Sequence, residues 1–203
     1  MELRMSLYPG DFLKYIIRWT ENIGPIHHLL KKRTPDSRMG DVELAVRFLA
    51  FQDDSIQYSG DLKRFLDLTC EEYNNQFSSP AFSAKCESLL KEMNAGIELG
   101  ISTFGIDKFC RKYQDGKYET RFNRAVFDVL VYSLSRPQIR DWSLQHPGAL
   151  CATYENLSGG DTSFVRSVET TTKSIEATKY RFSSWLEAIN KASGIKLAPP
   201  NIA

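Results

Sequence analysis

Apolar residues recur at helical spacing along most of the chain, and the clearest case follows Ser79-Pro80. A cap residue followed by proline at the first helical position is a typical helix start. Beyond it the apolar positions advance by three or four residues along one helix face: Phe82, Cys86, Leu89, Leu90, Met93 and Ile97. Gly100 predicts the end of this helix.

Similar spacing predicts helices on both sides of this segment. Asp11 and Asp61 are candidate caps, Ser37 or Asp41 begins another helix, and Arg136-Pro137 ends one. The expected apolar faces lie within 12–23, 42–49, 62–73, 122–134, 164–168 and 175–189.

Turn residues separate these segments. Asp115-Gly116 predicts a loop or a broken helix end over 108–118, and Ser158 to Asp161 predicts a second loop. Thr170-Thr171-Thr172 is typical of a helix boundary. No alternating strand pattern exceeds four residues. The sequence therefore predicts an all-α fold: one domain of about eight helices over residues 1–195, and a fraying C-terminal tail over 196–203.

Composition narrows the class of protein. Hydrophobic residues at 42% and charged residues at 25% are ordinary globular values. With 26 basic and 25 acidic side chains, any nucleic-acid contact must depend on a local patch.

The longest apolar stretch, Ala125 to Leu134, is interrupted by Asp128 and is far shorter than the ~20 residues of a membrane helix. With no apolar N-terminal run either, we expect a soluble cytoplasmic protein.

Familiar catalytic and metal-binding patterns are missing from the sequence. The four cysteines form no CxxC pair, which predicts reduced, mostly buried thiols and no zinc site. His27, His28 and His146 lie near no carboxylate at metal-ligand spacing, and Asp53-Asp54 and Glu71-Glu72 are adjacent pairs that diverge on a helix. We therefore expect no catalytic residues, no metal and no cofactor.

Two basic groupings are candidates for binding. The first comprises Lys31, Lys32, Arg33 and Arg38. The second comprises Lys108, Arg111, Lys112, Lys117, Arg121 and Arg124, with Tyr113 and Tyr118 between them. Cations interleaved with aromatic rings could grip a nucleic-acid backbone and stack a base. The alternative is a solvated loop balanced by Asp107, Asp115 and Glu119.

Several segments together resemble the GmrSD-type restriction family, long described as a domain of unknown function. Residues 2–12 resemble its "ELRNxxYxGxF" segment, 36–50 its "RMxDxELxLRFLA" helix and 58–66 its "YxGxxxxFL" continuation. Phe104-Gly105 with Phe109 resembles "FGxxxF", 122–128 contains "NxAxFD", and Thr170-Thr171 with Arg181-Phe182 resembles the final helix. The segments occur in the family's order across nearly the whole chain.

The resemblance implies a helical half without the family's catalytic half. Family members carry an N-terminal ParB/sulfiredoxin-like domain with a DGQQR motif, linked to nucleotide hydrolysis and DNA cleavage, and many carry an HNH nuclease. Neither motif occurs here. The resemblance implies a lobe interface formed by Glu2, Arg4, Tyr8, Arg38, Asp41, Glu43 and Arg47. Because buried charges must be paired, internal pairing is the alternative role.

The sequence supports three hypotheses for function. The first is a non-catalytic helical subunit or fragment of a modified-DNA restriction or anti-phage defence system, docking with a ParB-like nucleotide-hydrolysing protein or domain and contacting DNA. The second is a stand-alone regulatory or inhibitor protein resembling an antitoxin. The third is a small all-α nucleic-acid-binding protein. An enzyme complete in this chain is the least favoured.

Overall fold

The computed structural model describes residues 7–169 and 172–203, and its fold is predominantly α-helical, as predicted. The described part contains ten helices rather than eight. They are α2 (Asp11–Glu21), α3 (Pro25–Leu29), α4 (Gly40–Gln52), α5 (Leu62–Gln76), α6 (Pro80–Phe104), α7 (Arg124–Leu134), α8 (Pro137–Gln145), α9 (Ala149–Gly160), α10 (Thr162–Glu169) and α11 (Ile175–Ser193). Two short strands, β1 (Arg111–Gln114) and β2 (Lys117–Phe122), lie between α6 and α7.

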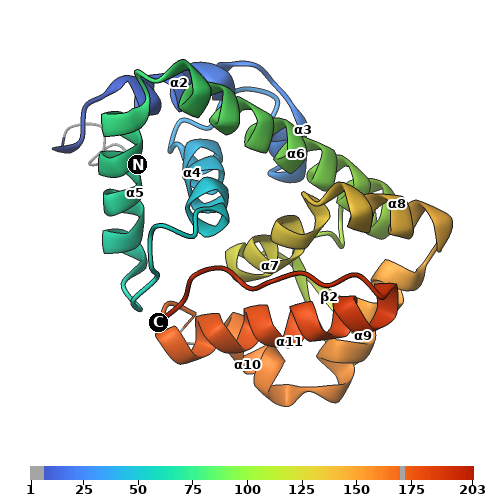
Figure 1. The fold of residues 1–203 in the computed structure, drawn as a ribbon. Coiled ribbons are helices and arrows are strands. Elements are labelled where there is room, and N and C mark those ends of the chain that lie inside the picture. The colour runs from blue at the N-terminus through green and yellow to red at the C-terminus, as the bar shows by residue number, and fades with distance from the viewer. Residues whose placement is uncertain (1–6, 170–171) are drawn as a thin grey trace.

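Helices α4 and α7 are the centre of the fold. Helix α4 packs against α2, α5, α6 and α7, whereas α7 also contacts α6, α8 and α11. In Figure 1, α2, α4, α5 and α6 form one side of the molecule and α9, α10 and α11 the other, with α7 between them. Every residue from Ala125 to Leu134 is buried, Asp128 and Ser133 included, because α7 is covered from all sides.

Helix α6 continues through both of its glycines to Phe104, so the predicted end at Gly100 is wrong. A Cβ on Gly96 would lie 2.8 Å from the Leu134 carbonyl carbon, and one on Gly100 would lie 2.1 Å from Cζ of Phe109. These glycines therefore allow close packing rather than a helix stop. No helix in the described part of the chain, α6 included, is long and apolar enough to cross a bilayer.

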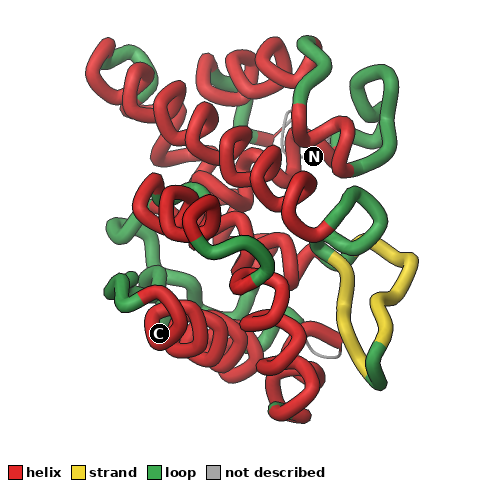
Figure 2. The backbone as a smooth tube through the Cα atoms, turned by 90° about the vertical axis from the view of Figure 1, so that its right-hand side faces the viewer, coloured by secondary structure: helices red, strands yellow, loops and turns green. Residues whose placement is uncertain are grey.

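Strands β1 and β2 form an antiparallel hairpin where the sequence predicted a loop or broken helix end. Asp115 and Gly116 both have positive φ angles, 51° and 76°, as a tight two-residue hairpin turn requires. Tyr113 lies opposite Tyr118. The prediction was wrong because a four-residue strand is too short to show clear alternation. Figure 2 shows the hairpin at the edge of the molecule.

Helix boundaries after α7 differ in part from the prediction. Helix α9 includes Ser158 and the two glycines that follow it, so the predicted loop is reduced to Asp161, which alone separates α9 from α10. Oδ1 of Asp161 accepts a hydrogen bond from the Phe164 amide at the start of α10. Helices α3, α8 and α9 were not predicted. The predicted boundary at Thr170-Thr171 lies outside the described residues, while Thr172 precedes α11 and Ser174 caps it by accepting from the Ala177 amide.

The C-terminal segment 194–203 is attached along its length rather than frayed as expected. The Tyr132 hydroxyl donates to the Ala198 carbonyl (3.0 Å), and the Tyr58 amide donates to the Asn201 carbonyl (2.9 Å). Ile202 forms a parallel bridge with Tyr58. In Figure 1 the segment runs back from the end of α11 towards α5, so it links the two sides of the molecule.

Candidate interface: a buried ionic cluster and an adjoining cleft

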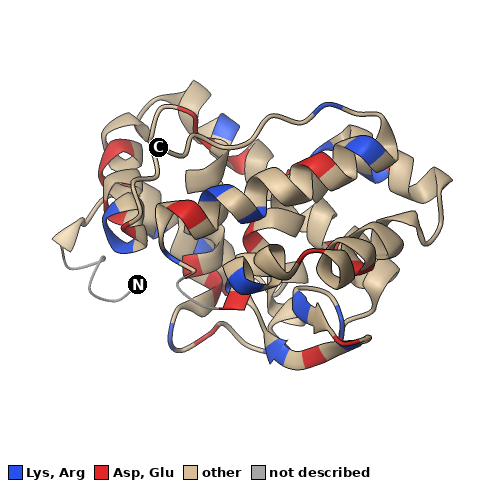
Figure 3. Ribbon diagram, turned by 90° about the horizontal axis from the view of Figure 1, so that it is seen from below, with Lys and Arg blue, Asp and Glu red and all other residues tan. Residues whose placement is uncertain are grey.

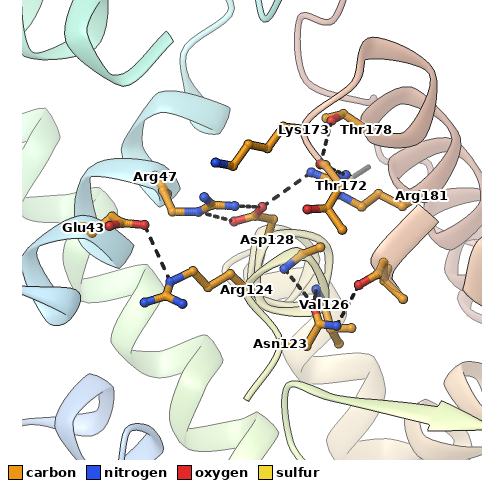
Figure 4. A network of polar contacts seen from close by, with 12 residues as sticks. Glu43, Arg47, Asn123, Arg124, Val126, Asp128, Thr172, Lys173, Thr178 and Arg181 are labelled. Carbon is orange, nitrogen blue, oxygen red and sulfur yellow. Dashed lines mark hydrogen bonds and ion pairs between the residues drawn. The ribbon is translucent and has the colours of Figure 1, made fainter. Parts of the chain in front are cut away.

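A buried ion pair joins the two central helices. Arg47 on α4 donates from Nε to Asp128 Oδ1 on α7 (3.0 Å) and from Nη2 to Asp128 Oδ2, and each residue is only 4% exposed. Figure 4 shows this two-pronged contact. Burial opposes the charge on Arg47, but Asp128 outweighs it and raises the pKa of Arg47 above its ordinary value. Arg47 therefore stays charged, and its contact with Asp128 fixes α4 against α7.

A second buried guanidinium approaches the same carboxylate. Nη2 of Arg181 on α11 lies 3.7 Å from Asp128 Oδ2, and Nη1 donates to the Thr172 carbonyl (2.7 Å). Nε has no hydrogen-bond partner among the described residues. Burial lowers the pKa of Arg181 to about 10, so it remains charged near neutral pH. Two buried guanidiniums thus share one carboxylate; we call Arg47, Asp128 and Arg181 the ionic cluster.

A separate buried pair anchors the start of α4. His27 Nδ1 accepts from the Gly24 amide (3.1 Å), which places the ring proton on Nε2, 3.1 Å from Asp41 Oδ2. Asp41 also accepts from the amides of Asp36 (2.9 Å) and Val42 (2.8 Å). His27 and Asp41 are buried, so this polar contact holds α3 to α4.

The residues of the expected lobe interface fall into three groups. Asp41 and Arg47 are buried and paired within the chain, so this structure leaves neither available to a partner and corresponds to the internal-pairing alternative. Arg38 is exposed, whereas Tyr8 and Glu43 are half-buried at the surface. Glu2 and Arg4 lie outside the described residues.

The residues of the expected nucleic-acid group also differ in burial: two of the six cations are buried and four are exposed. Arg111 is buried and donates to the carbonyls of Phe109 (3.0 Å) and Thr120 (3.2 Å). Lys112 is buried as well, and its Nζ lies 2.7 Å from carboxylate oxygens of both Glu119 and Glu169. These two cations therefore hold the hairpin in place and do not belong to an exposed patch.

The hairpin tyrosines are engaged within the fold. The rings of Tyr113 and Tyr118 pack edge to face at 4.9 Å, and the Tyr118 hydroxyl donates to Glu155 (3.0 Å). Burial, followed by this hydrogen bond, raises the pKa of Tyr118. Lys108 Nζ lies 5.6 Å from the centre of the Tyr118 ring. Both rings are half-buried and make these contacts within the fold.

Of the four exposed cations of this group, Arg121 and Arg124 line a cleft of about 430 Å³ between the hairpin, the start of α7 and the end of α10. We call it the hairpin cleft. Its walls are Lys112, Glu119, Arg121, Phe122, Asn123, Arg124, Ala125, Val168, Glu169 and Thr172. Arg121 and Arg124 are exposed, as is Lys117 at the hairpin turn, and Figure 3 shows how basic and acidic residues alternate over the molecule. Arg124 Nε lies 3.6 Å from Glu43, a loose ion pair.

Asn123 connects the hairpin cleft to the fold behind it. Its Oδ1 accepts from the amides of Ala125 (2.9 Å) and Val126 (3.1 Å), which caps α7, and its Nδ2 donates to the Val168 carbonyl (2.8 Å). The side chain therefore orients both the first turn of α7 and the end of α10.

Of the acidic partners in the two sites, the sequence analysis named only Glu119 as a charge that balances the second basic group. Asp128 was noted as an interruption of an apolar run and as the last residue of a family motif, and neither Glu169 nor Arg181 received a polar role. A carboxylate within a run of buried apolar residues was the usable signal, since such a group must find a partner. Its partner Arg47 lies 81 positions away, which no local pattern indicates.

Comparisons with protein-family models, curated proteins and solved structures find no match to this chain.

Proposed function

We propose that the chain is a non-catalytic helical module of a modified-DNA restriction or anti-phage defence system, which docks with a ParB/sulfiredoxin-like nucleotide-hydrolysing lobe. The supporting observation is the meeting of residues from separate segments of the family resemblance. Arg47, Asp128 and Arg181 come from three of those segments and converge in the ionic cluster.

A fourth segment reaches the same region. Tyr58 is buried, its hydroxyl donates to the Lys173 carbonyl, and Arg181 and Arg47 lie close enough to influence its pKa. If these amphipathic helices matched the family only by chance, their polar motif residues would not be expected to lie together in the fold. Their convergence supports a shared helical framework and assigns these charges to holding it.

Docking then depends on the motif residues that remain at the surface. Arg38 is exposed beside the start of α4, and Glu43 is half-buried one turn further along that helix. Exposed charges contribute to partner choice and to the rate of association. A lobe encoded beside this chain would be met in the cytoplasm, where the four free cysteines stay reduced.

Co-purification with a ParB-like protein encoded next to this chain tests the proposal. We expect a stable complex that is weakened at least tenfold by Arg38→Glu. Lys191→Glu, an equal charge reversal at an exposed position on α11, is the matched control and should leave binding unchanged. Failure of the native chain to bind such a protein would reject the docking role.

Contact with nucleic acid is a second candidate, favoured by one observation. Lys108, Lys117, Arg121 and Arg124 remain exposed once the two buried cations, Arg111 and Lys112, are excluded from the predicted group. Four exposed cations would give binding that weakens steeply with salt, because each phosphate contact releases counterions.

A further inference from the structure

The hairpin cleft has the size and lining of a site for a small charged group. Its volume of about 430 Å³ lies within the range of roughly 300–1,000 Å³ that is typical of ligand sites. Its walls are mainly charged and polar, whereas sites for apolar molecules are lined by aliphatic and aromatic side chains. The lining therefore favours an ionic ligand.

The acidic side chains of the cleft are paired more closely than its two exposed arginines. Its two carboxylates, Glu119 and Glu169, both lie 2.7 Å from Lys112 Nζ, so one cation holds both. Burial lowers the pKa of Lys112, but the two glutamates outweigh it and raise the pKa, which keeps the lysine charged. On the other side, Arg121 makes no ion pair with any described residue, and Arg124 has only its 3.6 Å contact with Glu43.

The ionic cluster adds positive charge behind one wall of the cleft. Thr172 lines the cleft, and its carbonyl accepts the hydrogen bond from the buried Arg181. Asp128 is shared between Arg181 and Arg47, so one positive charge of the cluster is not compensated within it. A buried charge is poorly screened by solvent, and its field extends into the nearest polar cavity. The cleft is thus favourable to an anion.

We propose that the hairpin cleft binds a phosphate group, held by the guanidiniums of Arg121 and Arg124. Guanidiniums bind phosphate oxygens through paired N–H donors. Arg121 has no carboxylate partner among the described residues and Arg124 has only its loose contact with Glu43, so both can supply such donors. The phosphate belongs either to a nucleic-acid backbone or to a free nucleotide. The proposal does not depend on docking with a lobe, since every residue it uses comes from this chain.

Titration of the purified chain with three probes tests the proposal: inorganic pyrophosphate, ATP and a fluorescent 20-nucleotide single strand. Arg121→Gln with Arg124→Gln should weaken binding at least tenfold. Arg18→Gln with Lys191→Gln removes the same charge from exposed positions on α2 and α11 and should change it less than twofold. Amide chemical shifts of Asn123 and Thr172 should move on titration.

The probes also separate the two sources of phosphate. Binding of ATP or pyrophosphate at one molecule per chain indicates a nucleotide site, and binding of the oligonucleotide alone indicates a backbone site. The proposal is overturned if no probe binds at millimolar concentration, if the control variant loses as much affinity as the cleft variant, or if polyglutamate binds as tightly. None of these results bears on co-purification with a lobe, so the two proposals fail independently.

Discussion

The ionic cluster and the hairpin cleft use the same kinds of residue in opposite ways. In the cluster, Arg47 meets Asp128 through two donors and both side chains are almost fully buried. At the cleft, Arg124 lies 3.6 Å from Glu43 outside it, and the two side chains are 53% and 29% exposed. Desolvation forces close pairing in the first region, whereas water replaces a partner in the second. Burial, rather than residue type, separates a structural charge from one that can bind.

The largest effect expected from this comparison is that of Asp128→Ala. The substitution leaves Arg47 and Arg181 buried without a carboxylate, which we expect to destabilise the fold by about 3–5 kcal/mol. Urea unfolding followed by circular dichroism measures the change. Asp141→Ala, which removes an exposed carboxylate from α8, is the control and should shift stability by less than about 0.5 kcal/mol. Equal stability of the two variants would show that the cluster holds nothing together.

The next effect concerns the second buried pair. His27→Ala removes one donor from the buried Asp41 and the acceptor of the Gly24 amide, and should cost about 2 kcal/mol. His28→Ala changes the exposed neighbour on the same helix and is a closely matched control. If both variants unfold at the same urea concentration, the pairing of His27 with Asp41 does not stabilise the start of α4.

A smaller loss is expected at the junction between the two regions. Asn123→Ala removes the cap of α7 and the hydrogen bond to Val168, so stability should fall by about 1–2 kcal/mol. Asn123→Asp keeps the oxygen that caps α7 but loses the donor to Val168, so it should be more stable than Asn123→Ala and less stable than the native protein. Thermal unfolding of the two variants compares them. Identical melting temperatures would assign the whole effect to the bond with Val168.

The smallest effect on stability is expected in the cleft itself. Arg121→Gln with Arg124→Gln should alter the free energy of unfolding by less than about 0.5 kcal/mol, because both side chains are exposed. The same urea experiment checks this on the protein used for the phosphate titrations. A loss above about 2 kcal/mol would place these arginines with the structural charges and remove the contrast between the regions.

The order of helices was predictable because each carries its own periodic signal and its own end. Ser79-Pro80 begins α6, Asp61 caps α5 by accepting from the Arg64 amide, and α7 ends before Pro137. These features depend on neighbours a few residues apart. The hairpin was missed for a related reason: Asp115-Gly116 is a hairpin turn as well as a loop signal, and its strands are too short to decide between them.

Sequence alone thus determined the all-α class, the main helices and which residues could carry charge. Tertiary structure decided what those charges do. Arg111 and Arg121 lie in one basic stretch, yet the fold buries the first and exposes the second. Gly100 was predicted to end α6, yet the absence of its side chain makes room for Phe109, as that of Gly96 does for Leu134. The physical reason is that partners such as Arg47 and Asp128 are distant along the chain, and burial depends on packing from every side.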